Sequence, residues 1–136
     1  MTARDPGGLE AFLREEGAPD AVVRGGLDVL LVGWERTVEA VEAGYGGDYE
    51  DYLGDLDGRQ LLAQALERVT REQAAAVAAR LVELDRRIRA VTTPVARCLW
   101  GNIVADEEGW SPEDNWWYFA RPVQGPEAFL AEFPEA

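Results

Sequence analysis

The stretch "REQAAAVAARLVELDRRIRAV", residues 71–91, has the clearest periodicity in the chain. Its large apolar residues are spaced alternately four and three positions apart: Val77, Leu81, Leu84, Ile88 and Val91. This spacing places them on one face of an α-helix. Thr70 and Gln73 match the capping-box pattern and mark the beginning of that helix. The stretch therefore predicts an amphipathic helix that packs against another apolar helix face.

The segment 18–47 supplies a second apolar face. Its apolar positions follow the same alternation: Val23, Leu27, Leu30, Trp34, Thr37 and Val41. Pro19 suits the first turn of this helix, and Gly44 ends the pattern. Three glycines interrupt it: Gly25, Gly26 and Gly33. Since each costs about 1 kcal/mol relative to alanine, they either allow close helix packing or mark a bend or break.

Shorter helices are predicted on both sides of this segment. Residues 9–16 form an opening helix that ends at Gly17, and residues 49–56 fit a short helix of their own. Asp57 and Gln60 resemble a second capping box, which would begin a separate helix that runs to Val69.

The pattern changes after residue 92. The apolar run 93–104 indicates a strand near 95–104 or an extended strap, and both 111–114 and 126–133 carry signals for a short helix. We therefore expect a mainly α fold in one domain, residues 1–136. An antiparallel bundle of about four helices (9–92) would be covered by an irregular, Trp-rich C-terminal segment (93–136).

The residue inventory excludes much chemistry. There are 26 acids and 13 bases, all of them arginine, for a net charge of -13, and the chain has neither lysine nor histidine. Histidine-based catalysis, imidazole metal ligands and lysine Schiff bases are therefore absent. Cys98 fits a small buried apolar side chain better than a nucleophile. We assign no catalytic residue, no cofactor and no metal, and a charge this negative disfavours nucleic acid and anionic membranes.

The acidic stretch 46–58 is the candidate for carboxylate chemistry. Its "DLDG" portion resembles the middle of a calcium-binding EF-hand loop, but Leu53 and Gln64 stand where that loop requires acids. A magnesium ion held by carboxylates, or a hydrolase with an acid pair, stays an alternative. Otherwise these acids belong to a solvated face.

The charges are segregated along the chain. Residues 35–57 hold eight acids and one arginine, whereas residues 68–97 hold seven arginines and three acids. This distribution predicts that the acidic helix lies along the arginine-bearing one. Residues 106–114 add five acids and no base, so some acidic surface should remain unpaired.

Aromatic residues gather in "GWSPEDNWWYFARP", residues 109–122. If residues 115–119 are extended, Trp117 and Phe119 face one side while Trp116 and Tyr118 face the other. A helix would spread the four rings around its circumference with a similar result. One pair then anchors the segment, and the other meets solvent or a partner, for which Trp, Tyr and Arg are well suited.

These features favour a small, acidic, non-enzymatic protein-binding module of the immunity, inhibitor or adaptor kind. We expect a basic protein partner and, from the single cysteine and the absence of an apolar leader, a cytoplasmic location. The candidate interaction surface comprises Trp110, Trp116, Trp117, Tyr118, Arg121, Asp48, Glu50, Asp51 and Asp55.

Two alternatives remain. One is a small-molecule-binding protein or carboxylate-based enzyme, whose pocket would lie between bundle and tail and be lined by Trp110, Trp116, Tyr118 and Arg121. The other is a homodimer formed through an exposed aromatic patch.

Overall fold

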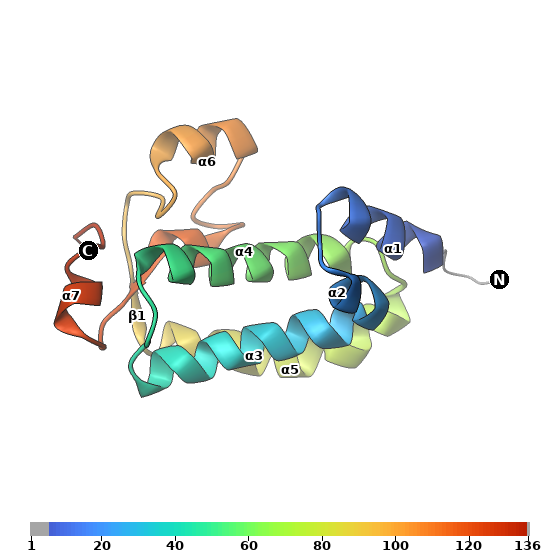
Figure 1. The fold of residues 1–136 in the computed structure, drawn as a ribbon, viewed down its shortest axis with the longest axis horizontal. Helices are drawn as coiled ribbons and strands as arrows, with labels where there is room; N and C mark the ends of the chain where they lie inside the picture. The colour runs from blue at the N-terminus through green and yellow to red at the C-terminus, as the bar shows by residue number, and fades with distance from the viewer. Residues whose placement is uncertain (1–5, 136) are drawn as a thin grey trace.

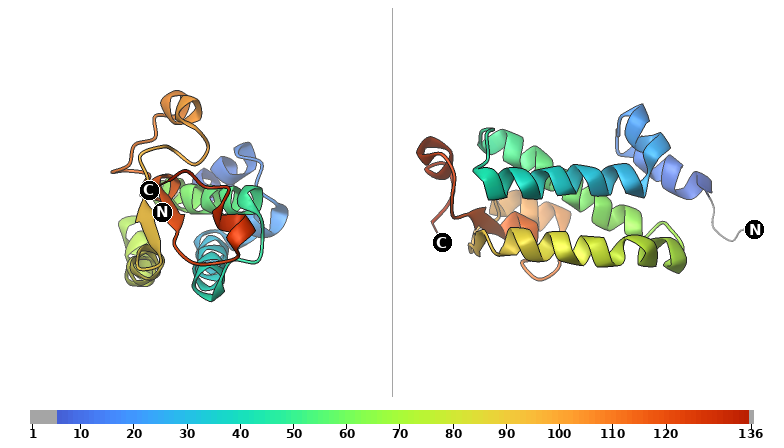
Figure 2. Two further views of the ribbon diagram at one scale, coloured as in Figure 1. Left: turned by 90° about the vertical axis from the view of Figure 1, so that its left-hand side faces the viewer. Right: turned by 90° about the horizontal axis from the view of Figure 1, so that it is seen from below.

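Three long helices form the centre of the molecule in the computed structural model, which describes residues 6–135. The elements follow in the order α1 (Pro6–Glu15), α2 (Asp20–Gly25), α3 (Leu27–Ala43), α4 (Tyr49–Leu66), α5 (Arg71–Arg89), β1 (Thr92–Pro94), α6 (Asn102–Glu108), the 3-10 helix η1 (Trp116–Phe119), β2 (Ala120–Pro122) and α7 (Glu127–Leu130). Helices α3, α4 and α5 run in alternating directions (Figure 1) and occupy the corners of a triangle when seen end-on (Figure 2). The predicted mainly α fold with bundled helices is confirmed.

Helix α5 begins at the predicted residue with the predicted cap and ends at Arg89, two residues before the predicted end. Thr70 and Gln73 form the reciprocal capping box, and the side chains of the predicted seam are buried at Val77, Leu81, Leu84 and Ile88. Leu81, Leu84 and Ile88 share one apolar core with the buried apolar residues of α3, which are Leu30, Trp34, Val38 and Val41. The two helices thus cover each other's apolar faces, and this burial is the main stabilising contribution to the bundle.

The segment 18–47 is broken at Gly26, whose φ of 61° lies in the left-handed region, so α2 and α3 are separate. This is the break that its glycines left open as one of two alternatives. Another helix boundary differs from the prediction. The break expected before Asp57 does not exist, because α4 is continuous. Its capping box is formed by Asp48 and Asp51, and Asp57 instead lies mid-helix with its side chain engaged elsewhere.

A buried ion pair joins all three long helices. Arg59 of α4 donates from Nε and Nη2 to the carboxylate of Asp85 on α5, at 3.1 and 2.8 Å. The same carboxylate accepts a hydrogen bond from Nε1 of Trp34 on α3, at 2.9 Å. The guanidinium also lies 4.2 Å from the ring centroid of Trp117 in η1. Because only 7% of the Arg59 side chain is exposed, its charge depends on these partners.

Ion pairs between α3 and α5 confirm the prediction that the acidic helix lies along the arginine-bearing one. Arg80 pairs with Glu35, and Arg87 forms two hydrogen bonds with Glu42. These pairs are partly exposed, so they select which helices are neighbours more than they stabilise the fold.

The C-terminal segment closes one end of the bundle. Strands β1 and β2 pair antiparallel with Thr93 opposite Arg121, so the strand lies just before the range 95–104 and α6 begins inside that range. Phe129 and Phe133 pack against Tyr45 and Tyr52. Figure 1 shows α7 at the end of the molecule opposite α1 and α2.

Removing the acceptor for Arg59 tests the role of the buried pair. Asp85→Ala leaves the guanidinium buried without a counter-charge and is expected to lower the free energy of unfolding by about 3–5 kcal/mol. Glu83→Ala breaks an exposed pair with Arg86 on the same helix and should have a far smaller effect, because solvent screens that pair. Urea denaturation followed by circular dichroism measures both variants. Equal losses would contradict a central role for the buried pair.

The buried tyrosines determine how stability changes at high pH. Burial raises the pKa of Tyr45, Tyr52 and Tyr118 above the ordinary value, and hydrogen bonds to Asp55 and Asp57 raise those of Tyr45 and Tyr118 further. A group whose folded pKa is raised contributes stability that is complete below its unfolded pKa, about 10 for tyrosine, and is lost above it.

We therefore expect the urea midpoint to fall steeply above about pH 10, after a shallower loss from about pH 8.5 due to the buried thiol of Cys98, whose pKa burial also raises. Burial raises the pKa of the fourth tyrosine, Tyr49, as well. Since the chain has no lysine, tyrosines and the one cysteine are the side chains that titrate in this range. Tyrosinate absorbance and helix content should change together. Tyrosinate absorbance that rises fully near pH 10 while the helices persist would contradict the prediction.

Candidate functional site

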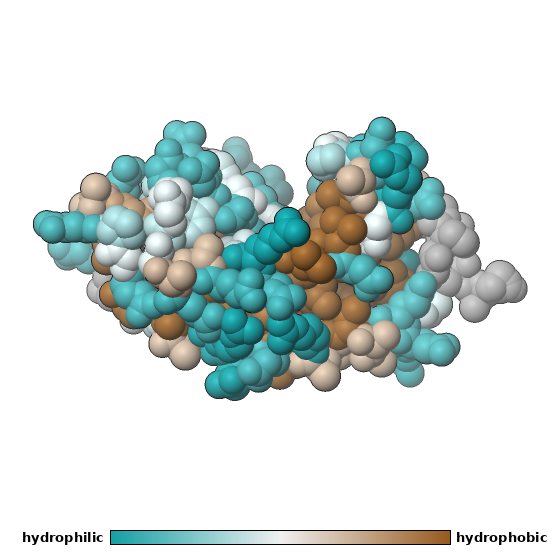
Figure 3. Space-filling view, turned by 60° about the horizontal axis from the view of Figure 1, so that its bottom comes forward, coloured by the Kyte–Doolittle hydropathy of each residue, from teal (hydrophilic) through white to brown (hydrophobic). Residues whose placement is uncertain are grey.

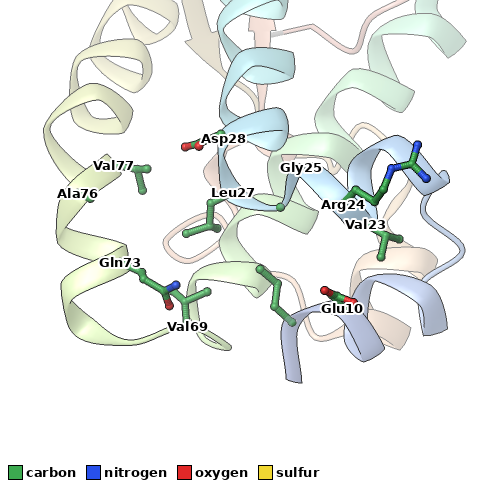
Figure 4. A pocket seen from close by; sticks show the side chains of 12 residues that line it. Glu10, Val23, Arg24, Gly25, Leu27, Asp28, Val69, Gln73, Ala76 and Val77 are labelled. Carbon is green, nitrogen blue, oxygen red and sulfur yellow. The ribbon is translucent and has the colours of Figure 1, made fainter. Parts of the chain in front are cut away.

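A hollow of about 330 Å³ with a mixed polar and apolar lining is formed by residues of α1, α2, α3 and α5. Figure 3 shows apolar surface gathered right of centre on one face of the molecule. In Figure 4, Leu27 and Val69 point into the hollow, whereas Arg24 points away from it. Because its polar groups do not converge on one point, this hollow lacks the feature that orients a specific ligand.

The aromatic segment forms the 3-10 helix η1, so of the two conformations considered for residues 115–119 the helical one applies and the extended one does not. In a 3-10 helix, residues three apart share a face. Trp116 and Phe119 accordingly line one pocket, while Tyr118 lines another on a different side. Trp117 is buried against Arg59. The segment thus anchors in the core through Trp117 and separates two pockets.

The larger of these two pockets has a volume of about 540 Å³ and lies beside α4. We call it the α4–α6 pocket. It is lined by Glu16, Asp57, Gln60, Leu61, Gln64, Trp100, Val104, Glu108, Trp110 and Tyr118. The four α4 residues among them follow the i, i+3, i+4, i+7 pattern and therefore share one face of that helix. Figure 1 shows α6 and α1 on the same side of α4, toward its two ends.

Asp57 is held in place by two donors. Its Oδ1 accepts a hydrogen bond from Oη of Tyr118 at 2.6 Å and another from Nε1 of Trp100 at 2.9 Å. Oδ2 accepts none from the residues that the structure describes. Burial and the hydrogen bond to Asp57 raise the pKa of Tyr118, so this hydroxyl stays a donor at neutral pH. One carboxylate oxygen is thus fixed while the other is available to an incoming donor.

Aromatic rings form the other wall of the α4–α6 pocket. Trp110 stacks on Tyr118 with ring centroids 4.0 Å apart and an interplanar angle of 15°. Asn115 donates to Gln60 at 2.9 Å and so ties the segment before η1 to α4. Trp100 is 40% exposed, and its ring is oriented by the bond to Asp57. Aromatic faces next to carboxylates are favourable surroundings for a cation.

The pocket is electrostatically one-sided. Three carboxylates, from Glu16, Asp57 and Glu108, line it, and no arginine does. None of the three forms an ion pair within residues 6–135. The acids of α6 and the following turn, at positions 106–114, are also exposed and free of ion pairs in that part of the chain. The acidic surplus noted in the sequence therefore lies beside this pocket.

Helix α6, which supplies Val104 and Glu108 to the pocket, also carries an exposed apolar side chain. Ile103, on α6, is 77% exposed, and Ala105 is the one buried residue of that helix. Helix α6 therefore presents most of its surface outward.

The predicted surface residues lie in several places. Asp48 and Asp51 cap α4, Asp55 accepts a hydrogen bond from Tyr45, and Glu50 is exposed. Arg121 donates to the main-chain carbonyls of Leu130 and Pro134 and so fastens the C-terminal turn. Trp117 and Tyr118 are buried, and Trp116 lies on the other side of η1 from the α4–α6 pocket.

Of the predicted residues, the structure thus brings only Trp110 and Tyr118 into the α4–α6 pocket. Sequence reasoning missed the roles of Asp57, Trp100, Glu16 and Glu108. The available signal was the spacing of Asp57, Gln60, Leu61 and Gln64, a partly polar helix face within a packed bundle.

Metal binding and membrane insertion receive no support from the described residues. Across 6–135, no group of three or more acidic, cysteine or histidine side chains is placed to hold a metal ion. In the same range, no helix combines the length and the hydropathy that a membrane span requires. Comparison with known proteins finds no family model, no curated protein and no solved structure that matches this chain.

Proposed function

We propose that this protein is a non-enzymatic binding module that docks a basic protein partner over the α4–α6 pocket, with an arginine or lysine side chain of the partner inserted into it. One observation carries the proposal: a concave site in which carboxylates and tryptophans converge, and whose lining contains no base. A cationic group placed there meets Asp57 Oδ2 and the ring of Trp100 at once.

The physical basis is charge complementarity. Desolvation of three carboxylates is unfavourable unless a counter-charge accompanies the partner, so a neutral or acidic partner is rejected. The acids at 106–114 extend the negative field around the pocket and speed the encounter with a basic surface. The net charge of -13 acts in the same direction.

The exposed rim favours a protein over a free small molecule. Trp100 lines the pocket and is 40% exposed, and Ile103 exposes further apolar surface on α6, the helix that supplies Val104 and Glu108 to the pocket. Exposed apolar surface next to polar groups is what a protein interface buries. Asp57, Glu16 and Glu108 are themselves exposed, so the pocket is open rather than closed around a small ligand. An acidic face that complements a basic partner suits an immunity protein, an inhibitor or an adaptor, which is the class that we propose.

The proposal is tested with an oligo-arginine peptide as the probe. Asp57→Asn keeps the shape of the side chain but removes its charge, and we expect it to weaken binding about tenfold or more, since a charge-assisted hydrogen bond is lost. Isothermal titration calorimetry gives the affinity, and tryptophan fluorescence reports contact with Trp100.

Glu50→Gln is the matched control, because it removes one charge from an exposed position on the same helix. We expect less than about a twofold change for this variant, since solvent screens its charge. Equal weakening by both substitutions would mean that the peptide responds only to net charge and would overturn the proposed site. Light scattering on the free protein separates this function from homodimerisation.

A further inference from the structure

A second pocket lies on the opposite side of η1 and has the opposite electrostatic character. It has a volume of about 360 Å³ and is lined by Arg89, Thr92, Pro94, Val95, Pro112, Trp116, Phe119 and Ala120. Val95, Phe119 and Ala120 are buried and form its floor, while the two prolines are exposed at its rim. No carboxylate lines it, although the chain has two acids for every arginine.

Arg89 is the one charged group of this pocket, and its environment differs from that of its neighbours on α5. Arg80, Arg86 and Arg87 each pair with a glutamate. Arg89 forms no ion pair within residues 6–135, and its guanidinium lies 4.1 Å from the ring centroid of Trp116.

The contact with Trp116 holds the guanidinium at the edge of the pocket and uses none of its N–H groups. A planar fork of donors held in this way matches the two oxygens of a carboxylate. The position of Arg89 in the last turn of α5 also favours an arginine, because its positive charge lies near the partial negative charge of the helix C-terminus. The dipole does not account for the apolar pocket that the guanidinium borders.

We propose that this second pocket binds an apolar carboxylate, with the carboxylate on Arg89 and the apolar group between Trp116, Pro94 and Pro112. The volume lies at the lower end of the range for small-molecule sites, about 300–1,000 Å³, so the apolar group has the size of one aromatic or branched side chain. Such a carboxylate is found in a free organic acid and at the C-terminus of a peptide that ends in a large apolar residue. The two sources share the same chemistry at Arg89.

Nuclear magnetic resonance distinguishes these sources. The probes are 3-phenylpropionate, its neutral amide, and a short peptide ending in phenylalanine with either a free or an amidated C-terminus. We expect the acid forms to shift the indole N–H signal of Trp116 and the amide forms to bind about tenfold or more weakly. Tighter binding by the free acid than by the peptide identifies a small-molecule site, and the reverse order identifies a peptide C-terminus; both support the site.

Two substitutions on α5 provide the matched comparison. Arg89→Gln should weaken binding of the acid forms about tenfold or more, whereas Arg71→Gln, at an exposed position at the other end of the same helix, should change it less than about twofold. Arg89→Lys keeps the charge without the fork and should fall between Arg89→Gln and the unaltered protein. Circular dichroism confirms that each variant is folded.

Three results would overturn the proposal: equal binding of acid and amide, signal changes at other tryptophans but not at Trp116, or no change at Trp116 with either acid probe. This site is independent of the α4–α6 pocket. Its failure would leave the proposed binding of a basic partner unaffected, because neither Arg89 nor Trp116 lines that pocket.

Discussion

The interaction between Arg59 and Asp85 constrains the rest of the molecule. An arginine side chain does not lose its charge in proteins, so a guanidinium taken out of water must find its counter-charge within the bundle. Here Asp85 supplies that charge from α5, and Trp34 of α3 donates to the same carboxylate. Each long helix contributes one member, and a shift of any helix along its neighbours would break the network. The ion pair therefore sets the register of helices whose apolar faces alone would tolerate sliding.

The same guanidinium organises the C-terminal segment. Trp117 packs against Arg59, which fixes η1 on the bundle. Once Trp117 points inward, the threefold repeat of a 3-10 helix directs the remaining rings to two other sides. Tyr118 then reaches Asp57, and Trp116 reaches Arg89. The two candidate pockets thus depend on one anchoring contact in the core, although they do not share a lining residue.

Sequence reasoning succeeded where a single local rule decides the structure. The seam from Val77 to Ile88 and the cap at Thr70 predict α5 correctly, because periodicity and capping act within a few residues. The α3–α5 ion pairs were also foreseen, since segregated charges leave few other pairings.

The role of Asp57 was misread because a capping box and a mid-helix carboxylate look alike in sequence. Only the distant residues Trp100 and Tyr118 distinguish the two, and no local pattern contains them. At Gly26 the sequence allowed either a continuous helix or a break, because glycine tolerates both helical and positive φ, and the structure has the break.

The position of Asp57 on α4 makes the acidic pocket rigid before any partner arrives. Asp57 and Gln60 point to the pocket side of the helix, while Arg59, between them, points into the core. The turn of α4 that carries the recognition carboxylate is therefore held by the ion pair on its inner side. On its outer side, Trp100 and Tyr118 orient the carboxylate itself, and Gln60 is bonded to Asn115. A partner consequently has little side-chain ordering to induce at this point, and the free energy of the new contacts is available for affinity. The buried ion pair between Arg59 and Asp85 thereby stabilises the fold and also holds the turn of α4 that presents Asp57 at the surface.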